Sequence, residues 1–204
     1  MIEFFTLQNH ILSIHNTNEV CFKPLSPDFE SCATQSIFQW WQNDLEKFSQ
    51  TFNTSSYNCA KNTPDTFSWH DHFMSCSVNP ASIDDGANHL TCLGEYGGPA
   101  FPFVALGGSP KNDIDRYDYS MSEALVMTLE NNNFEDRGSV GYEKALIWER
   151  DFLKLMGDFE SEFFNVAYFS ERSVEDEIDR AGNSDLPLFF SAQCEQTVKT
   201  TLIT

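Results

Sequence analysis

Four of the six cysteines fall into two pairs that are close in sequence, and this spacing limits the folds that the chain can adopt. Cys21 and Cys32 bracket one loop rich in Pro, Asp and Ser, and Cys76 and Cys92 bracket another rich in Asn and Asp. Four cysteines allow three pairings, and closure of each local loop is the simplest. Such a disulfide stabilises a fold by about 3 kcal/mol in the chain-entropy account. A zinc site would need close CxxC-like spacing, which the chain lacks, so we expect two local disulfides.

The composition indicates a folded domain and excludes nucleic-acid binding. The chain has 204 residues, 41% of them hydrophobic, and 19 are Phe, which is incompatible with a disordered segment. This length suits a single domain with a substantial core. Acidic residues outnumber basic ones 31 to 12, for a net charge of -19. No basic stripe is present that could bind phosphate backbones.

Cysteine usage and a glycosylation motif together indicate an oxidising compartment. The sequon Asn53-Thr54-Ser55 predicts a glycan on Asn53, and six cysteines fit a secreted or luminal domain. The state of Cys59 and Cys194 is left open. The first residues, MIEFFTLQNHILSIHN, do not form a signal peptide, and no apolar run approaches the ~18 residues of a transmembrane helix. We therefore expect a piece of a longer protein of the secretory pathway.

Hydrophobic periodicity predicts an α+β fold, or a related α/β type, in which a small, mostly antiparallel sheet packs with several helices. An exposed, turn-rich loop is expected over 50–65. The predicted strands cover 19–22, 101–108, 123–130 and 163–169. The predicted helices cover 2–16, 32–49, 67–76 and 139–158, and a further helix begins at the capping-box residue Ser173.

A glycine-rich stretch over 92–108, CLGEYGGPAFPFVALGG, resembles a phosphate loop only superficially. Its glycines fit neither GxGxxG nor GxxxxGK[ST], so no phosphate site is predicted. The glycines and prolines instead indicate turns into and out of a short buried strand.

One tight cluster, His70, Asp71 and His72, contains potential acid-base groups or metal ligands. On a helix, residues two apart point roughly 200° away from each other, so the two imidazoles could not share a metal ion; on a strand they could. We expect a helix with one histidine packed and the other solvated. GxSxG, HExxH and EF-hand motifs are absent. The sequence therefore predicts no catalytic residue, no metal site, no cofactor and no enzyme.

A series of motifs extends this interpretation. VCFKPLSP, CLGEYGGPAFPFVALGG, EALVMT, ALIWERDFL and SERSVEDEIDR, followed by SDLP, occur in that order over about residues 7–189. Together they resemble the Niemann-Pick type C sterol transporter family, which is related to Patched and to resistance-nodulation-division transporters. The resemblance is to the middle luminal domain, just before the sterol-sensing membrane segments. It implies the same two local disulfides.

The resemblance also implies a function. Members move cholesterol in the late endosome or lysosome, while a paralogue acts in sterol uptake at the extracellular face of the plasma membrane. Their middle luminal domain docks the soluble Niemann-Pick type C sterol carrier protein, so that cholesterol can pass to the N-terminal sterol-binding domain. The expected partners are this carrier and the other luminal domains, and contact with sterol is indirect. A structural spacer without carrier binding is the alternative.

Docking in this family uses two protruding loops with aromatic tips. The second is expected within Asn62, Thr63, Pro64, Asp65, Thr66 and Phe67, where Pro64 and a single Phe67 stand in place of two adjacent aromatics. The first loop and the first strand are expected to precede residue 1. We expect the middle luminal domain over 1–190, followed by a divergent polar tail over 191–204.

Overall fold

The computed structural model divides the chain into two compact units, Met1–Glu135 and Asp136–Thr204, each described here by itself. For 52–58 and 63–65 the backbone alone is described. The described residues are 1–58, 63–85, 89–112, 116–132, 136, 138–170 and 178.

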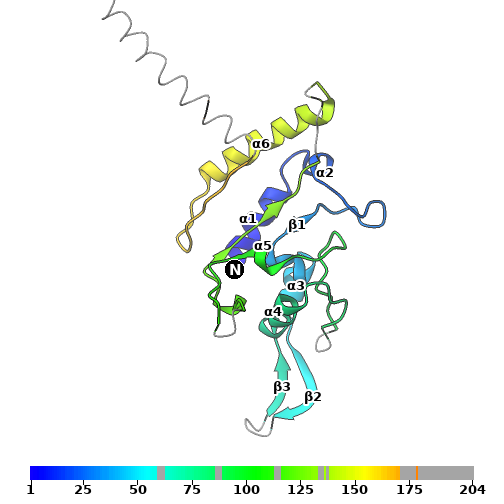
Figure 1. The fold of residues 1–204 in the computed structure, drawn as a ribbon, viewed down its shortest axis with the longest axis vertical. Helices are drawn as coiled ribbons and strands as arrows, with labels where there is room; N and C mark the ends of the chain where they lie inside the picture. Colours follow the sequence, from blue (N-terminus) through cyan, green and yellow to red (C-terminus); the bar gives the residue numbers. More distant parts are fainter. Residues whose placement is uncertain are drawn as a thin grey trace, which may run out of the picture. The chain divides into compact units, whose positions relative to one another are not determined.

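The first unit combines short helices with short strands (Figure 1). Its strands are β1 (Thr34–Gln35), β2 (Phe52–Asn58), β3 (Thr63–Phe67), β4 (Leu106–Gly107), β5 (Ala124–Leu125) and β6 (Thr128–Leu129). Its α-helices are α1 (Ile2–Leu12), α2 (Thr17–Val20), α3 (Leu45–Ser49), α4 (Trp69–Val78) and α5 (Pro102–Ala105), and its 3-10 helices are η1 (Ile37–Trp41) and η2 (Tyr119–Met121).

All strand pairings in the described part of the chain are antiparallel. β1 pairs with β6, β2 with β3 and β4 with β5, each as a two-stranded sheet. This arrangement confirms the α+β class and the small antiparallel sheet content. The expected strand over 123–130 is divided between β5, which pairs with β4, and β6, which pairs with β1, because the segment changes partner after Val126, whose amide still donates to the Ala105 carbonyl at 2.9 Å.

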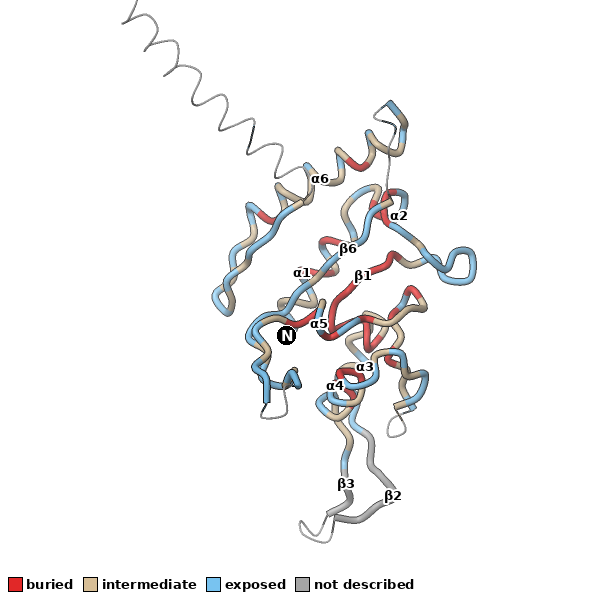
Figure 2. Tube along the Cα trace, viewed as in Figure 1, coloured by how far each residue is buried: buried red, intermediate tan, exposed pale blue. Residues whose placement is uncertain are grey.

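The core lies around η1 and α4, where aromatic residues meet a disulfide. Figure 2 colours the buried parts of the chain red. Trp40 and Phe73 pack edge to face with ring centroids 5.4 Å apart, and Trp41 lies 6.5 Å from Trp40. The buried cluster comprises Ile37, Phe38, Trp40, Trp41, Phe73, Cys76, Cys92, Ala100, Ala105 and Leu106.

The expected helix over 32–49 is wrong as a single element. Residues of η1 are buried all round rather than on one face, and the chain leaves helical geometry at Gln42 and Asn43, which have φ of 49° and 56°. A new helix, α3, then follows. Its N-cap residue is Asp44, whose carboxylate accepts from the Glu46 amide at 2.8 Å. Periodicity over 32–49 therefore reflects two short helices with a left-handed turn between them.

Both local disulfides are confirmed. Cys21 bonds Cys32 with Cα atoms 5.5 Å apart, and Cys76 bonds Cys92 with Cα atoms 5.4 Å apart. The second bridge joins α4 directly to the glycine-rich segment. Its two cysteines are fully buried.

The glycine-rich segment is held by three glutamines at helical spacing. Gln42 Nε2 donates to the Leu93 carbonyl at 2.7 Å, Gln39 Oε1 accepts from the Glu95 amide at 2.9 Å, and Gln35 Oε1 accepts from the Phe101 amide at 2.8 Å. A Cβ at Gly94 would lie 2.7 Å from Gln39 Oε1, so glycine permits this approach.

The strand predicted over 101–108 is mostly wrong. Pro102 begins the short helix α5, where its missing N–H costs no hydrogen bond, and only Leu106–Gly107 forms a strand. The strand predicted over 19–22 is also wrong. α2 occupies Thr17–Val20, and Cys21 makes an isolated bridge to Asn131. In both cases a short apolar run was consistent with either state.

The structure corrects two further expectations and confirms a third. The first helix ends at Leu12 rather than 16, and the sequence 50–65 contains the paired strands β2 and β3 rather than only a loop. α4 confirms the helix expected over 67–76.

The second unit contains α6 (Val140–Asp158), which confirms the predicted long helix. Its N-cap residue Ser139 accepts from the Tyr142 amide at 3.2 Å. Trp148 stacks on Phe152 at 5.3 Å, and Phe152 in turn meets the Tyr168 ring at 6.3 Å. The strand predicted over 163–169 is wrong, because those residues form no backbone ladder. Among their apolar side chains, Tyr168 packs against Phe152 of α6. The helix start predicted at Ser173 lies outside the described residues.

Within the described ranges, no helix combines the length and the apolar character needed to cross a bilayer.

Candidate functional site

The predicted docking loop belongs to a β-hairpin. β2 and β3 pair with Phe52 opposite Phe67, Asn53 opposite Thr66 and Asn58 opposite Thr63, with a register shift between Asn53 and Tyr57. Figure 1 shows the two strands running out together from the side of the first unit where α3 and α4 lie. The residues Thr63, Pro64, Asp65, Thr66 and Phe67 form β3, and Asn62 lies outside the described residues.

Within the described residues, each strand of this hairpin has the other as its one partner. The predicted glycosylation residue Asn53 lies in β2, opposite Thr66 of β3. The predicted glycosylation motif and the expected docking residues 63–67 thus share one two-stranded element.

The two ends of the hairpin are joined by aromatic rings. Phe48 in α3, just before β2, stacks on Trp69, just after β3, with centroids 5.7 Å apart and planes at 27°. Phe48 also meets Trp41 edge to face at 5.0 Å and Phe38 at 5.6 Å. Since Trp41 and Phe38 are fully buried, the ring stack connects the hairpin's base to the core.

The exit from β3 is fixed by a capping arrangement. The Ser68 amide donates to Asp71 Oδ2 at 2.8 Å and the Ser68 hydroxyl lies 3.1 Å from the same oxygen, while the Asp71 amide donates to the Ser68 carbonyl at 3.1 Å. A capping box of this kind starts a helix at a defined residue. The chain therefore changes from strand to helix within two residues.

The two histidines of the cluster occupy opposite environments, which confirms the expected helix with one histidine packed. His70 is exposed, whereas the side chain of His72 is fully buried. His72 Nδ1 lies 2.8 Å from Asp85 Oδ2, and Nε2 lies 2.8 Å from the Trp40 carbonyl oxygen. The carbonyl can only accept, so Nε2 carries a hydrogen, and Nδ1 lies within hydrogen-bond distance of the carboxylate. This pair ties α4 to η1 and to the loop that follows α4.

His72 also lies near a cysteine pair with metal-ligand geometry. Ligand atoms of His72, Cys76 and Cys92 fall within 4.8 Å of one another. The two sulfurs are bonded to each other, however, and a metal ion binds the thiolate form of cysteine. In this oxidised state His72, Cys76 and Cys92 are buried residues of the core.

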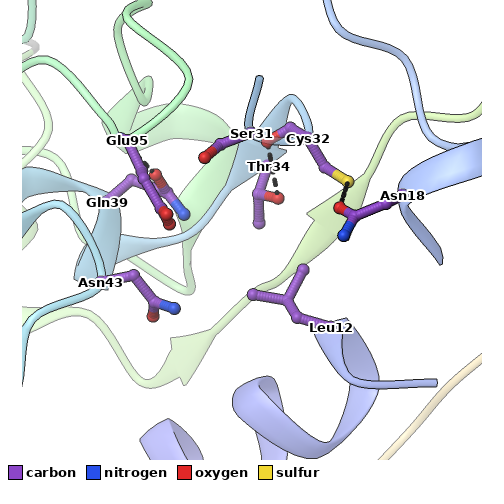
Figure 3. Close-up of a pocket in the computed structure, with 8 residues that line it drawn as sticks. All are labelled: Leu12, Asn18, Ser31, Cys32, Thr34, Gln39, Asn43 and Glu95. Carbon is purple, nitrogen blue, oxygen red and sulfur yellow. Dashed lines mark hydrogen bonds between the residues drawn. The ribbon is translucent and has the colours of Figure 1, made fainter. Parts of the chain in front are cut away.

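A small pocket lies in the first unit (Figure 3). Its volume is about 200 Å³, below the ~300–1,000 Å³ of typical ligand sites. Most lining side chains are polar, in contrast to the apolar lining that a sterol requires. The lining residues are Leu12, Asn18, Ser31, Cys32, Thr34, Gln39, Asn43 and Glu95.

The sequence analysis did not predict the contacts that hold α4 and the base of the hairpin in place. Asp85, the partner of His72, lies in a loop without any motif, and no pattern indicated it. The ring pair Phe48 and Trp69 brackets the polar segment 50–65, so aromatics flanking a polar stretch were an available signal for a hairpin.

Comparison with known proteins identifies the domain. Residues 1–172 match the family described as NPC1, middle luminal domain. The chain is 36% identical over 178 residues to the human NPC1-like intracellular cholesterol transporter 1 and 37% identical over 179 residues to its mouse counterpart. It is 31% identical over 169 residues to the pig NPC intracellular cholesterol transporter 1.

These alignments cover 84%, 84% and 82% of this chain. They cover only 12%, 13% and 12% of the relatives, so the chain spans about an eighth of the length of those proteins. The match extends across both units, from α1 through α6. The chain belongs to the NPC1 middle luminal domain family.

Proposed function

We propose that this domain is the luminal docking module of a cholesterol transporter. In this proposal its β2–β3 hairpin receives the soluble sterol carrier, and cholesterol then passes to an N-terminal sterol-binding domain. The observation that carries the proposal is the hairpin's support. The hairpin that contains the expected docking residues 63–67 extends from a fixed base. This base is held by the Phe48–Trp69 stack, the capping box and the Cys76–Cys92 disulfide. Preorganised elements of this kind lose little freedom on binding.

The polar pocket of Figure 3 is itself a poor match for a sterol. Its volume of about 200 Å³ and its polar lining do not suit a rigid apolar ligand. The cargo itself follows from the relatives, two of which are named as cholesterol transporters of the NPC1-like type and one as an NPC transporter. We infer contact between this domain and the carrier protein, with sterol as an indirect partner.

The proposed location is the lumen of the late endosome or lysosome, within the full-length membrane protein; the extracellular face of the plasma membrane is the alternative. The net charge of -19 fits an acidic lumen, because carboxylates begin to protonate as the pH approaches their ordinary pKa of about 4. We further propose domain boundaries at 1 and 190 with a tail over 191–204, and a glycan on Asn53. A mass shift on enzymatic deglycosylation that is lost in Asn53→Gln would support the glycan.

The direct experiment is a pull-down of purified, cholesterol-loaded carrier by the glycosylated, oxidised chain at lysosomal and at neutral pH. We expect binding at lysosomal pH and weaker binding of Phe67→Ala, since interface energy concentrates in aromatic anchors. Absence of binding at both pH values would refute the docking function.

One observation favours a structural spacer as the second candidate. Phe67 is half-buried and lies in register with Phe52 at the base of the hairpin, which fits a packing role. If Phe67→Ala lowers the free energy of unfolding and leaves carrier binding intact, Phe67 is a packing residue and the contact lies elsewhere. If no hairpin variant alters carrier binding, the spacer function is favoured.

A further inference from the structure

We propose that the outer face of α4 belongs to the same docking surface as the hairpin, so that the soluble carrier contacts both. This inference rests on the proposed function and adds residues to its site. The face, termed the α4 stripe, consists of Trp69, His70, Met74 and Val78.

The α4 stripe is exposed although most of it is apolar. Trp69 is 41% exposed, Met74 37% and Val78 82%. His70, Met74 and Val78 are four residues apart, so they lie on one side of the helix and extend about 12 Å along it. The opposite side, with His72, Phe73, Cys76 and Ser77, is buried. The division between the two faces is therefore sharp, and the outer face carries no Asp, Glu, Lys or Arg, although such residues are usual on an exposed helix face.

Charge is scarce across the whole region. Asp71 is the single acidic residue in α4, and its carboxylate is engaged by Ser68 at the helix start. The hairpin sequence 51–67 contains one basic residue, Lys61, and one acidic residue, Asp65, which balance. In a chain with net charge -19, the sequences of the hairpin and of α4 thus carry few Asp, Glu, Lys or Arg residues.

The size of a stable interface requires more than the expected docking residues 62–67, even with a first docking loop of similar length. Specific complexes bury about 800 Å² on each partner and use roughly 20–30 residues a side. The expected docking residues 62–67 are too few to supply this area. The α4 stripe is the adjacent candidate, because β3 ends at Phe67 and α4 begins at Trp69, with the capping box fixing the junction.

The same charge distinguishes the possible occupants. A second copy would bring two chains of net charge -19 together, and an anionic membrane surface would repel the chain as well. A soluble partner with an apolar, uncharged contact face meets no such repulsion. Since α4 directly follows β3, we assign the α4 stripe to the carrier that the hairpin is proposed to receive.

The test measures the affinity of the full chain for cholesterol-loaded carrier at lysosomal pH, for the parent, Val78→Asp and Met74→Asp. Val140→Asp is the matched control, because Val140 is 72% exposed near the start of α6. A carboxylate buried against apolar partner surface lacks a counter-charge. We expect Val78→Asp and Met74→Asp to weaken binding about tenfold or more, and Val140→Asp to stay within about twofold of the parent. Circular dichroism should be unchanged in all three.

Two outcomes overturn the inference and leave the proposed function standing. The first is parent-like binding by both α4 variants together with lost binding by Phe67→Ala. The second is a change confined to self-association, measured by sedimentation, which would identify a second copy as the occupant. If the parent chain does not bind carrier at either pH, the docking function and this inference fail together.

Discussion

The core of the first unit and the hairpin that leaves it differ in what holds them. Around η1 and α4, side chains make the contacts: two tryptophans, a buried histidine with its aspartate, and a disulfide. In β2 and β3 the described contacts are those of the backbone ladder, with rings meeting at the base. A core of the first kind fixes position, while a two-stranded ribbon presents its edges to a partner. We therefore expect substitutions in the core to lower stability, and substitutions in the hairpin and on the α4 stripe to lower affinity.

The largest effect on stability is expected at the buried pair. Asp85→Ala leaves the His72 imidazole, whose side chain has 0% exposure, without its carboxylate partner. Loss of one member of a buried pair costs about 3–5 kcal/mol. Urea denaturation measures it, with Asp84→Ala as control, because Asp84 meets His89 at the surface with a 52% exposed side chain. Equal losses for the two variants would show that the core contact contributes no more than a surface pair.

A somewhat smaller effect is expected for the disulfides. Replacing Cys76 and Cys92 with Ala removes a loop constraint worth about 3 kcal/mol and leaves space in the aromatic core. The same change at Cys21 and Cys32, which lie outside the aromatic cluster, should cost less. The denaturant midpoints of the two double variants measure the difference. A larger loss for the Cys21 and Cys32 variant would contradict the central role of the Cys76–Cys92 disulfide.

Gly94→Ala tests the glutamine contacts and should cost about 1–3 kcal/mol. Its methyl group would lie 2.7 Å from Gln39 Oε1, the atom that accepts from the Glu95 amide. Gly138→Ala is the control, since the nearest atom there is 3.6 Å away. Thermal unfolding should separate the two variants by several degrees, and carrier affinity at a temperature where both are folded should be the same.

The smallest effect is a pH dependence. Burial raises the pKa of Tyr96 above its ordinary 10.0, and the hydroxyl donates to the Pro99 carbonyl at 2.5 Å. The unfolded chain ionises first, so stability is full below about pH 10 and is lost as pH rises through the folded pKa. The free energy of unfolding of the parent should therefore be constant up to about pH 10 and fall as the pH rises further. Tyr96→Phe should have a flatter alkaline profile; an identical profile would exclude Tyr96 as the source.

Patterns local in sequence predicted a substantial part of this fold. The spacing of Cys21 with Cys32 and of Cys76 with Cys92 gave the disulfides, because short loops close at low entropic cost. Amphipathic periodicity gave α4 and α6, and the helical spacing of His70 and His72 separated one exposed from one buried ring. Periodicity failed where residues are buried all round, as in η1, and where an apolar run is too short to distinguish helix from strand, as in α5.

The sequence by itself determined the family, the disulfides and the class of fold, since these depend on residues near one another along the chain. Only the tertiary structure decided that 50–65 contains a hairpin, that Phe48 and Trp69 stack across its ends, and that Asp85 meets His72. Such contacts join segments whose approach depends on the whole core. The stretch beginning at Cys92 shows both parts: its glycines indicated a turn, but the close approach of Gln39 to Gly94 required the folded chain.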